Sequence, residues 1–366
     1  MRESMSDKTA LIAMSGGVDS SVTALLLQEQ GFTCEGATMR LYRNEDIGVC
    51  QYHTCCSARD IDDAADVAFK LHIPYKVLDY TAAFKKEVIA KFVRIYEQGG
   101  TPNPCIDCNR FMKFRNLWEV AQKSQLNYVA TGHYARIEFD REQGLYVLKK
   151  GIDVSKDQSY VLYMLTQEQM AHTLFPLGGL TKKEVREIAA QHGLVNAHKH
   201  DSQDICFVPG GDYGKFLEEY TGKTYAKGDF LDIHGKVVGQ HKGAVRYTIG
   251  QRKKLGIALG KPVYVCGKDM VKNTVRVGDE ESLLSKGLVA TEANWLAGRA
   301  PTGAEEVWAR TRYKQQEQAA VVYPIGNDSF RLEFAKPQRA VAPGQAVVLY
   351  RGDVVVAGGT IAQVLR

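Results

Sequence analysis

Residues 9–21 read Thr9-Ala10-Leu11-Ile12-Ala13-Met14-Ser15-Gly16-Gly17-Val18-Asp19-Ser20-Ser21, an apolar run that ends in a glycine turn. Val22, Leu25 and Leu26 then recur at helical spacing, and Gly31 is a good residue to end that helix. A strand, a glycine turn and a helix start direct backbone N–H groups and the positive end of a helix dipole at one spot. The stretch therefore predicts an anion site, and phosphate is the expected anion.

The glycine turn differs from the two common nucleotide loops. Val18-Asp19 stands where a Walker loop needs lysine, and the third glycine of a dinucleotide motif is absent. The string from Ser15 to Ser20 resembles the pyrophosphate loop of ATP pyrophosphatases. That resemblance implies cleavage of ATP between its first two phosphates and adenylylation of a substrate. A glycine turn without any ligand is the alternative.

Length and composition indicate an ordinary water-soluble chain of several domains. The 366 residues are enough for two or three domains, with 45% hydrophobic and 24% charged residues. No apolar run approaches the roughly 20 residues of a membrane span, so we expect no membrane partner. The polar start leads directly into the first strand, which predicts a cytoplasmic protein without a secretory signal. A net charge of +5 permits a nucleic-acid partner without requiring one.

Alternating strand and helix patterns predict an α/β fold with a doubly wound, mostly parallel sheet in residues 1–210. The expected strands are 9–14, 32–39, 75–78 and 128–131, and the expected helices are 20–30, 59–72, 81–97 and 111–125. A hairpin over 135–148 and three helical patterns between Asp157 and Gly193 follow. Residues 211–285 read as a small mixed domain with a basic run, 246–254, that includes Tyr247. Short alternating runs in 286–366 predict a C-terminal β-barrel domain.

Eight cysteines in a chain expected in the cytoplasm do not indicate a disulfide framework. Cys34 and Cys266 lie in strand-like runs and are expected in the core. Cys105 and Cys108 lie three residues apart in an expected loop before a helix, whose N-terminus would lower a thiol pKa. Cys206 follows in a polar stretch. Half of a zinc site is the alternative for the Cys105–Cys108 pair, with further ligands from the segment 50–56.

Six motifs in sequence order carry a more specific resemblance. They are Ser-Gly-Gly-Val-Asp-Ser (15–20), Thr-Pro-Asn-Pro before a cysteine (101–105), Ala-Thr-Gly-His-Tyr (130–134), Lys-Asp-Gln-Ser-Tyr (156–160), Gly-Gln-Arg (250–252) and Pro-Gly-Gln (343–345). Together they resemble the tRNA-specific 2-thiouridylases of the ATP pyrophosphatase superfamily, which place sulfur on C2 of the wobble uridine of tRNA. The resemblance spans essentially the whole chain.

The resemblance implies roles for individual residues. Cys206 would carry a persulfide, and Cys108 would release its sulfur or close a disulfide with Cys206. Asp19 is predicted as both a catalytic and an ATP-binding residue, with magnesium balancing the pyrophosphate. The other predicted ATP-binding residues are Ala13, Met14, Ser15, Gly16, Gly17, Val18, Ser20, Met39 and Gly132. The predicted tRNA-binding residues are Asn103, Pro104, Cys105, His133, Lys156, Asp157, Gln158, Arg312, Tyr313 and Gln345. A sulfur carrier or a cysteine desulfurase would deliver the persulfide.

One departure from the family pattern opens a second mechanism. The better-known family members have an acidic residue at the position of Cys105, so Cys105, Cys108 and Cys206 add up to three thiols here. Three thiolates can hold an iron–sulfur cluster with one iron left open for sulfide. Two other functions stay open: a pyrophosphate-loop ligase that attaches an amine without thiol chemistry, and a zinc-stabilised tRNA-binding protein. Cys50, Cys55 and Cys56 receive no role.

Overall fold

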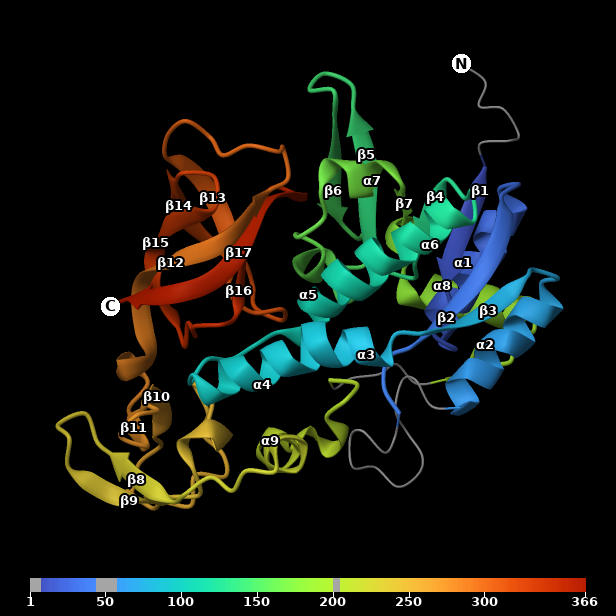
Figure 1. Cartoon of the computed structure of the whole chain (residues 1–366). Coiled ribbons are helices and arrows are strands. Elements are labelled where there is room, and N and C mark those ends of the chain that lie inside the picture. The colour runs from blue at the N-terminus through green and yellow to red at the C-terminus, as the bar shows by residue number, and fades with distance from the viewer. Residues whose placement is uncertain (1–7, 44–57, 200–204) are drawn as a thin grey trace.

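The N-terminal part of the chain is built around a five-stranded parallel sheet. The computed structural model describes residues 8–43, 58–199 and 205–366. Every neighbouring pair in the sheet order β3-β2-β1-β4-β7 is parallel (Figure 1). The strands are β1 (Thr9–Ala13), β2 (Thr33–Arg40), β3 (Tyr75–Asp79), β4 (Tyr128–Ala130) and β7 (Thr173–Leu174). The predicted α/β class with a doubly wound sheet is confirmed.

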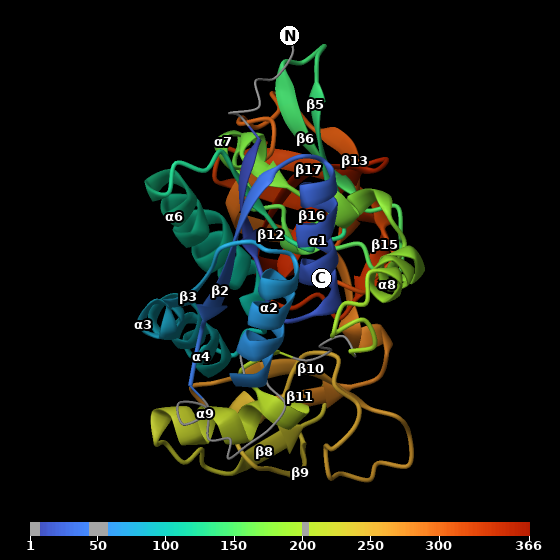
Figure 2. The same ribbon diagram turned by 90° about the vertical axis from the view of Figure 1, so that its right-hand side faces the viewer.

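Helices cover both faces of this sheet because side chains of a strand alternate between its faces. Ala10 and Ile12 of β1 pack into a core with α1, α2 and α8, whereas Leu11 packs on the opposite face against α6. Figure 2 shows α6 on one side of the sheet and α1 and α8 on the other. The helices span Val18–Glu29 (α1), Ala58–Lys70 (α2), Leu117–Lys123 (α6) and Lys182–Gln191 (α8).

The strand order reverses at β1, which has β2 on one side and β4 on the other. In open α/β sheets, ligands bind in the crevice outside the carboxyl ends of the strands at such a reversal. The glycine loop follows β1 and Gly132 follows β4, so the two predicted ATP-binding segments flank this crevice. The fold therefore places the candidate site at the carboxyl edge of the sheet.

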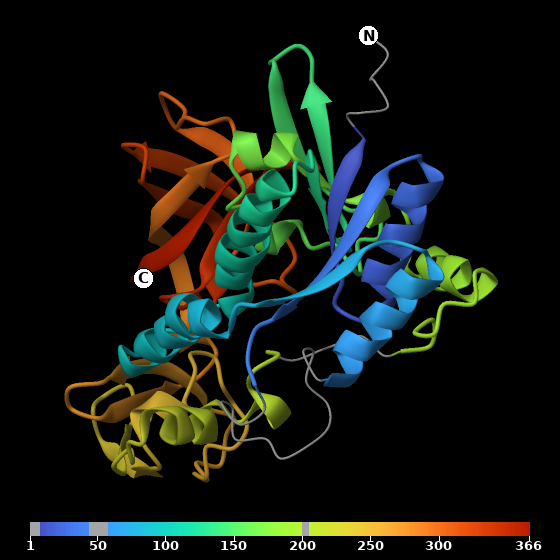
Figure 3. The ribbon, with the colours of Figure 1, turned by 45° about the vertical axis from the view of Figure 1, so that its right-hand side comes forward.

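Two long helical segments carry π-helical turns. The helix predicted over 81–97 consists of α3 (Thr81–Phe84), η3 (Lys85–Ile89) and α4 (Ala90–Glu97). The second segment consists of α5 (Pro104–Asp107), η4 (Cys108–Asn116) and α6. Figure 3 shows this second segment, in teal, between the barrel and the parallel sheet.

The second segment corrects the sequence analysis, which predicted a helix over 111–125 after a loop. The helix begins at Pro104, so Cys105 and Cys108 lie within it. Pro104 takes the first helical position, and the Asn103 side chain accepts a hydrogen bond from the backbone N–H of Cys105 at 3.2 Å. Both features stabilise a helix start at this point.

The predicted hairpin is present as β5 (Ala135–Asp140) and β6 (Leu145–Lys150). Only two of the three predicted helical patterns between Asp157 and Gly193 are α-helices, namely α7 (Gln167–Ala171) and α8. The same stretch also contains two short 3₁₀ turns, η5 (Ser159–Val161) and η6 (Pro176–Gly179), and β7 joins the sheet between them. Pro176, Gly178 and Gly179 disfavour a regular helix there.

The middle of the chain forms a small mixed unit, as predicted. Helix α9 (Tyr213–Thr221) precedes a four-stranded sheet in the order β10-β11-β8-β9. The turns η7 (Pro209–Gly211) and η8 (Ala244–Arg246) complete it. The strands are β8 (Gly228–Leu231), β9 (Val237–His241), β10 (Tyr264–Asp269) and β11 (Thr274–Gly278).

Six strands of the last part close into a barrel, because β12 pairs with both β15 and β17. They are β12 (Leu284–Trp295), β13 (Glu305–Arg310), β14 (Gln318–Ile325), β15 (Ser329–Arg339), β16 (Ala346–Arg351) and β17 (Val354–Leu365), with the turn η9 (Glu281–Leu283) before them. Val354 of β17 pairs with Lys149 of β6, which joins the barrel to the hairpin. The predicted barrel is confirmed.

We keep the division at residues 210/211 and 285/286 as a proposal that limited proteolysis can test. Within the described ranges, no helix has the length and hydropathy needed to cross a bilayer.

Candidate active site for ATP and sulfur chemistry

The glycine loop has a shape fixed by its own hydroxyl groups. Gly16 has a φ of 71°, and a Cβ there would collide with the backbone carbonyl of Asp60. The hydroxyls of Ser20 and Ser21 donate to the carbonyl oxygen of Gly17 at 3.0 and 3.1 Å. The first N–H groups of a helix have no partner within the helix. The start of α1 therefore offers these donors to an anion, as predicted for this loop.

Two side chains from the segment after α8 bind the carbonyl group of the glycine loop. Asn196 Nδ2 donates to the Gly16 carbonyl oxygen at 3.2 Å, and Lys199 Nζ donates to the same oxygen at 3.0 Å. Lys199 is itself paired with Asp60 at 2.5 Å and Asp63 at 2.6 Å. These contacts fix the orientation of the Gly16 peptide. The sequence analysis missed both residues, since no motif marks them.

The remaining predicted ATP-binding residues lie at the same edge of the sheet. Ala13 ends β1, Met14 follows it, and Met39 lies near the end of β2. A Cβ on Gly132 would collide with the backbone of Asp19, so the end of β4 is in close contact with the first turn of α1. The structure therefore brings the predicted residues together, and their contact with ATP stays a prediction.

Asp19 is bound by a lysine that the sequence analysis did not select. Lys182 Nζ lies 2.7 and 2.8 Å from the two carboxylate oxygens of Asp19, and the Tyr134 hydroxyl donates to one of them at 2.7 Å. The Lys182 ammonium also lies 5.8 Å from the centre of the Tyr134 ring. Lys182 is the first residue of α8, where a positive charge opposes the helix dipole. This unfavourable position was the one feature of the sequence that could have marked Lys182 as a functional residue.

Cys105 and Cys108 lie in the first turns of the helical segment that begins at Pro104. Cys105 is exposed and Cys108 is half-buried. Asp107, between them, points inward and pairs with Lys91 at 2.9 Å, although burial raises the pKa of its carboxyl group. This pair fixes the rotation of the helix, so that Cys108 faces an apolar cluster.

The pKa expected for Cys108 from the helix N-terminus was wrong in direction. Burial raises the pKa of the Cys108 thiol to about 11, and the nearby Lys113 ammonium only partly opposes this shift. A thiol loses more from leaving water as a thiolate than it gains from a helix dipole at this depth. Cys108 is therefore a thiol at neutral pH.

Alkylation should reveal this raised pKa. Because only the thiolate reacts, we expect the rate of iodoacetamide labelling at Cys108 to rise about tenfold per pH unit between pH 7 and 10. Labelling is followed by mass spectrometry of the peptide, with Cys108→Ser as the blank. A rate that levels off below pH 9 would contradict the buried thiol.

Cys206 belongs to the same apolar cluster as Cys108. Its carbonyl oxygen accepts a hydrogen bond from the Tyr42 hydroxyl at 2.9 Å. The next residue, Phe207, is buried with its ring 5.6 Å from Phe84 and 5.1 Å from Phe92. These contacts hold Cys206 and Phe207 against the helix that carries Cys108 and against the end of β2.

The structure shows Cys108 as a thiol, so the predicted disulfide with Cys206 is not formed in it. Among the described residues, no three His, Cys, Asp or Glu side chains are grouped closely enough to hold a metal ion. The role of Cys105, Cys108 and Cys206 as iron–sulfur ligands therefore stays a prediction. Cys50, Cys55 and Cys56 lie outside the described residues.

The barrel contributes two predicted tRNA-binding segments to the edge of this site. The backbone N–H of Thr101 donates to the Pro343 carbonyl at 2.8 Å, and Gln345 Nε2 donates to the Pro102 carbonyl at 3.5 Å. Tyr313 lies near enough to Cys105 for the two to interact electrostatically, and it remains 36% exposed. The Pro-Gly-Gln motif thus abuts the Thr-Pro-Asn-Pro loop that precedes the thiols.

Arg312 connects the barrel to the middle of the chain. Its guanidinium donates to the carbonyl oxygens of Ile249 and Ala340 at 3.0 and 2.7 Å. The two ends of the basic run 246–254 differ: residues 252–254 are exposed, whereas Tyr247 is buried against Phe230. Tyr247 therefore does not share the exposed surface of the basic residues in this run.

Several predicted tRNA-binding residues are engaged within the protein. Gln158 accepts a hydrogen bond from the Tyr134 backbone N–H at 3.0 Å, and Lys156 is half-buried. The Asp157 side chain is 2% exposed and is paired with Arg310 at 3.0 Å. Arg310 also pairs with Glu317 at 2.7 Å. Their contacts with tRNA stay predictions, but Asp157 has a clear structural role at the barrel.

Breaking this buried pair should destabilise the protein. Arg310→Met would leave the Asp157 carboxylate buried without its cation, so we expect the free energy of unfolding to fall by about 3–5 kcal/mol. Urea unfolding measures the change. In the control Arg351→Met, which loses an exposed pair with Glu305, the change should stay within about 1 kcal/mol. Equal effects in both variants would contradict the assignment.

His133 is buried beside the site. Lys113 Nζ lies 3.4 Å from its Nε2, and the Thr131 hydroxyl oxygen lies 2.6 Å from its Nδ1. Burial and the Lys113 charge hold the pKa of His133 well below its usual value. Because an ammonium can only donate, Nε2 accepts and the proton of the neutral ring is on Nδ1. Its predicted tRNA contact stays a prediction, although its ring packs between Phe114 and Phe175.

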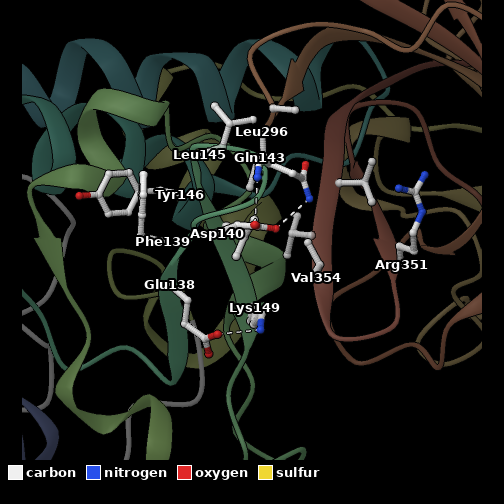
Figure 4. Close-up of a pocket in the computed structure, with 14 residues that line it drawn as sticks. Glu138, Phe139, Asp140, Gln143, Leu145, Tyr146, Lys149, Leu296, Arg351 and Val354 are labelled. Carbon is white, nitrogen blue, oxygen red and sulfur yellow. Dashed lines mark hydrogen bonds and ion pairs between the residues drawn. The ribbon is translucent and has the colours of Figure 1, made fainter.

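A cavity of about 350 Å³ lies elsewhere, between the hairpin and the barrel. Figure 4 shows its lining, with Glu138 beside Lys149 and Asp140 beside Gln143. It contains none of the predicted site residues. The chemistry is therefore expected at the sheet edge and not in this cavity.

Comparison with known proteins agrees with the three-part architecture. Three family models match: "tRNA methyl transferase HUP domain" over residues 8–210, "tRNA methyl transferase PRC-barrel domain" over 214–279 and "Aminomethyltransferase beta-barrel domain" over 285–361. The chain is 49% identical over 363 residues to the tRNA-specific 2-thiouridylase MnmA of Symbiobacterium thermophilum, covering 98% of this chain and 93% of that protein. The protein of the same name from Moorella thermoacetica is 49% identical over 356 residues, covering 97% of this chain and all of that protein (100%).

Proposed function

The chain belongs to the family of tRNA-specific 2-thiouridylases and is a tRNA sulfurtransferase, and from this premise we propose that it exchanges O2 of a wobble uridine for sulfur at the expense of ATP. One observation supports the proposal most. Cys108, Cys206 and the end of β2 belong to one apolar cluster at the carboxyl edge of the sheet that carries the glycine loop. Activation and sulfur transfer can therefore occur side by side.

The glycine loop would supply the activation step. A uridine oxygen is a poor leaving group, so it must first be joined to a phosphorus atom. ATP would bind with its phosphates at the start of α1, and the uridine O2 would attack the α-phosphorus and release pyrophosphate. Magnesium would bind together with ATP, coordinated by the phosphate oxygens of the nucleotide.

The two thiols would supply the substitution step. The terminal sulfur of a Cys206 persulfide attacks C2, the C2–O2 bond breaks, and AMP leaves with that oxygen. Cys108, after losing its proton, attacks Sγ of Cys206. The sulfur–sulfur bond breaks, its electron pair stays on the sulfur at C2, and a Cys108–Cys206 disulfide forms. An external thiol must then reduce this disulfide. The apolar surroundings of both thiols keep water from the adenylate.

The described residues show no grouped set of metal ligands, so the iron–sulfur cluster stays a prediction. We therefore favour the persulfide route, and derive no step through iron. Iron and acid-labile sulfide analysis of anaerobically purified protein distinguishes the two. Stoichiometric iron that is needed for repeated turnover would overturn the persulfide route.

Partners follow from the same chemistry. A persulfide on Cys206 requires a donor such as a sulfur carrier or a cysteine desulfurase. Tyr313 and Gln345 border the helix start from Asn103 to Cys105, which is where we place the tRNA. The family membership disfavours the other two functions considered. An amine ligase needs no thiols, and the further ligands considered for a zinc site lie in the segment 50–56, outside the described residues.

A single assay tests the proposal. The protein is incubated with ATP, magnesium, a persulfide donor and tRNA that bears a wobble uridine. Thiolated tRNA is then detected by its slower migration in a mercury-containing gel. We expect a retarded band that depends on ATP. Pyrophosphate release without any retarded band, under reducing conditions, would contradict the sulfur chemistry.

A further inference from the structure

A second cavity, of about 330 Å³, lies where the three parts of the chain meet. The end of α4 lines it with Gln98, Gly99 and Gly100, and the middle unit lines it with Ile249 and Cys266 to Lys268. The barrel and the turn before it complete the lining with Leu283, Ser285, Val341, Pro343, Val364 and Arg366. The cavity shares none of the residues assigned above to ATP, sulfur or uridine.

Lys268 brings a positive charge into this cavity without a compensating carboxylate. Its Nζ donates to the Tyr247 carbonyl oxygen at 2.7 Å. Within the described ranges no acidic side chain is paired with it, and burial alone lowers the pKa of Lys268 to about 8. An ammonium group has three donors, and the structure uses one of them in this contact. An ammonium group in this position is costly unless an anion balances it.

The other polar groups of the cavity favour the same kind of ligand. The guanidinium of Arg366 donates to the Cys266 carbonyl at 2.6 Å and is a second cationic group at the cavity, next to the α-carboxylate of the same residue. Ser285 adds a hydroxyl, and no Asp or Glu is among the lining residues. The nearby Asp279 accepts hydrogen bonds from the backbone and hydroxyl of Ser282 and is not part of the lining.

From this arrangement we infer that the cavity is a phosphate-binding site formed by Lys268, Arg366 and Ser285. A phosphodiester of the tRNA backbone and a free phosphate share this chemistry. The backbone phosphate is the ligand that we expect, and that choice rests on the proposed function. A phosphate held there would contact all three parts of the chain at once, because each of them contributes to the cavity wall.

Competitive amine labelling tests the site on the full chain. Lys268 is partly deprotonated at pH 7.5, so acetic anhydride should acetylate it faster than an ordinary lysine. A bound phosphate would favour the ammonium form. A rise of one unit in the pKa of Lys268 would slow its acetylation about tenfold. The probes are inorganic phosphate, tRNA, and chloride at the same ionic strength. Lys183, whose side chain is exposed, is the internal reference.

A second measurement identifies the source of the phosphate. Loss of one backbone contact should lower the slope of log Kd for tRNA against log salt by about 0.7–0.9 in Lys268→Met. The control Lys272→Met removes an exposed lysine from the turn between β10 and β11. Its slope should stay at the wild-type value. Circular dichroism melting verifies that both variants are folded.

Acetylation rates and the salt dependence of tRNA binding together distinguish a backbone phosphate from a free anion. Slower acetylation with tRNA together with a lower slope supports a backbone phosphate. Slower acetylation with inorganic phosphate and an unchanged slope supports a free-anion site. The inference is overturned if neither probe slows acetylation, or if tRNA alone slows it while the slope stays unchanged. Failure of the proposed function would appear instead as the absence of thiolated tRNA, which the phosphate experiment does not involve.

Discussion

Cys206→Ser should abolish thiolation while pyrophosphate release persists. A serine hydroxyl cannot carry a persulfide, so the attacking sulfur is lost, and we expect thiolated tRNA to fall by about 10³-fold or more. The glycine loop lies on another segment and is unchanged, so one equivalent of pyrophosphate should still be released per tRNA. The readouts are the mercury gel for sulfur and a coupled pyrophosphate assay for adenylylation.

Cys108→Ser should lose repeated turnover for a different reason. It keeps the persulfide-bearing thiol but lacks the thiol that resolves it, so a linkage between Cys206 and the tRNA should accumulate and be released by an added reductant. Cys34→Ala is the matched control, since Cys34 is buried in the core of the parallel sheet. Full thiolation by Cys206→Ser would contradict the assigned roles of both site thiols.

The fold could be predicted largely from local patterns. Apolar runs of strand length alternate with helical patterns up to residue 131, and this alternation specifies a parallel sheet. The alternating residues after 286 specify the barrel in the same way. The errors lie at helix starts, such as Pro104. There a proline and the Asn103 side chain start a helix earlier than its apolar pattern indicates.

The candidate site was predictable where a motif carries the chemistry and not where distant residues complete it. The glycine loop and the thiols form recognisable strings. Lys182 and Lys199 reach the loop from 163 and 183 positions away, and no local pattern reports such contacts. The pairing of Asp157 with Arg310, 153 residues further along the chain, could not be predicted for the same reason.

The pKa of Cys108 shows that local sequence rules also fail to predict the protonation of a buried group. A local rule, the helix dipole, predicts a lower value for a thiol near a helix start. Burial in a cluster assembled from several segments raises it instead, and burial dominates because desolvation penalises the charged form directly. Local rules therefore indicate where the reactive groups lie, whereas tertiary packing determines their protonation.

Lys182→Met should impair the ATP step while leaving the sulfur chemistry itself intact. Lys182 is the ammonium paired with Asp19 in the first turn of α1, with only 11% of its side chain exposed. Methionine keeps most of the length of the unbranched side chain and removes its charge. A charge placed beside the phosphates stabilises the pyrophosphate as it leaves, so we expect pyrophosphate release to fall by about 10²-fold or more. The measurement is the initial rate with saturating tRNA at several ATP concentrations.

Lys183→Met provides the matched control at the next position of the chain. The Lys183 side chain is 85% exposed and is paired with Glu187 on the same helix. Its loss should change neither the rate nor the KM for ATP. Lys182→Met should still accept a persulfide on Cys206, since that thiol lies in the cluster behind β2. If both lysine variants released pyrophosphate at the wild-type rate, Lys182 would serve only to hold Asp19 in place. Equal losses in both variants would instead indicate a general effect of charge.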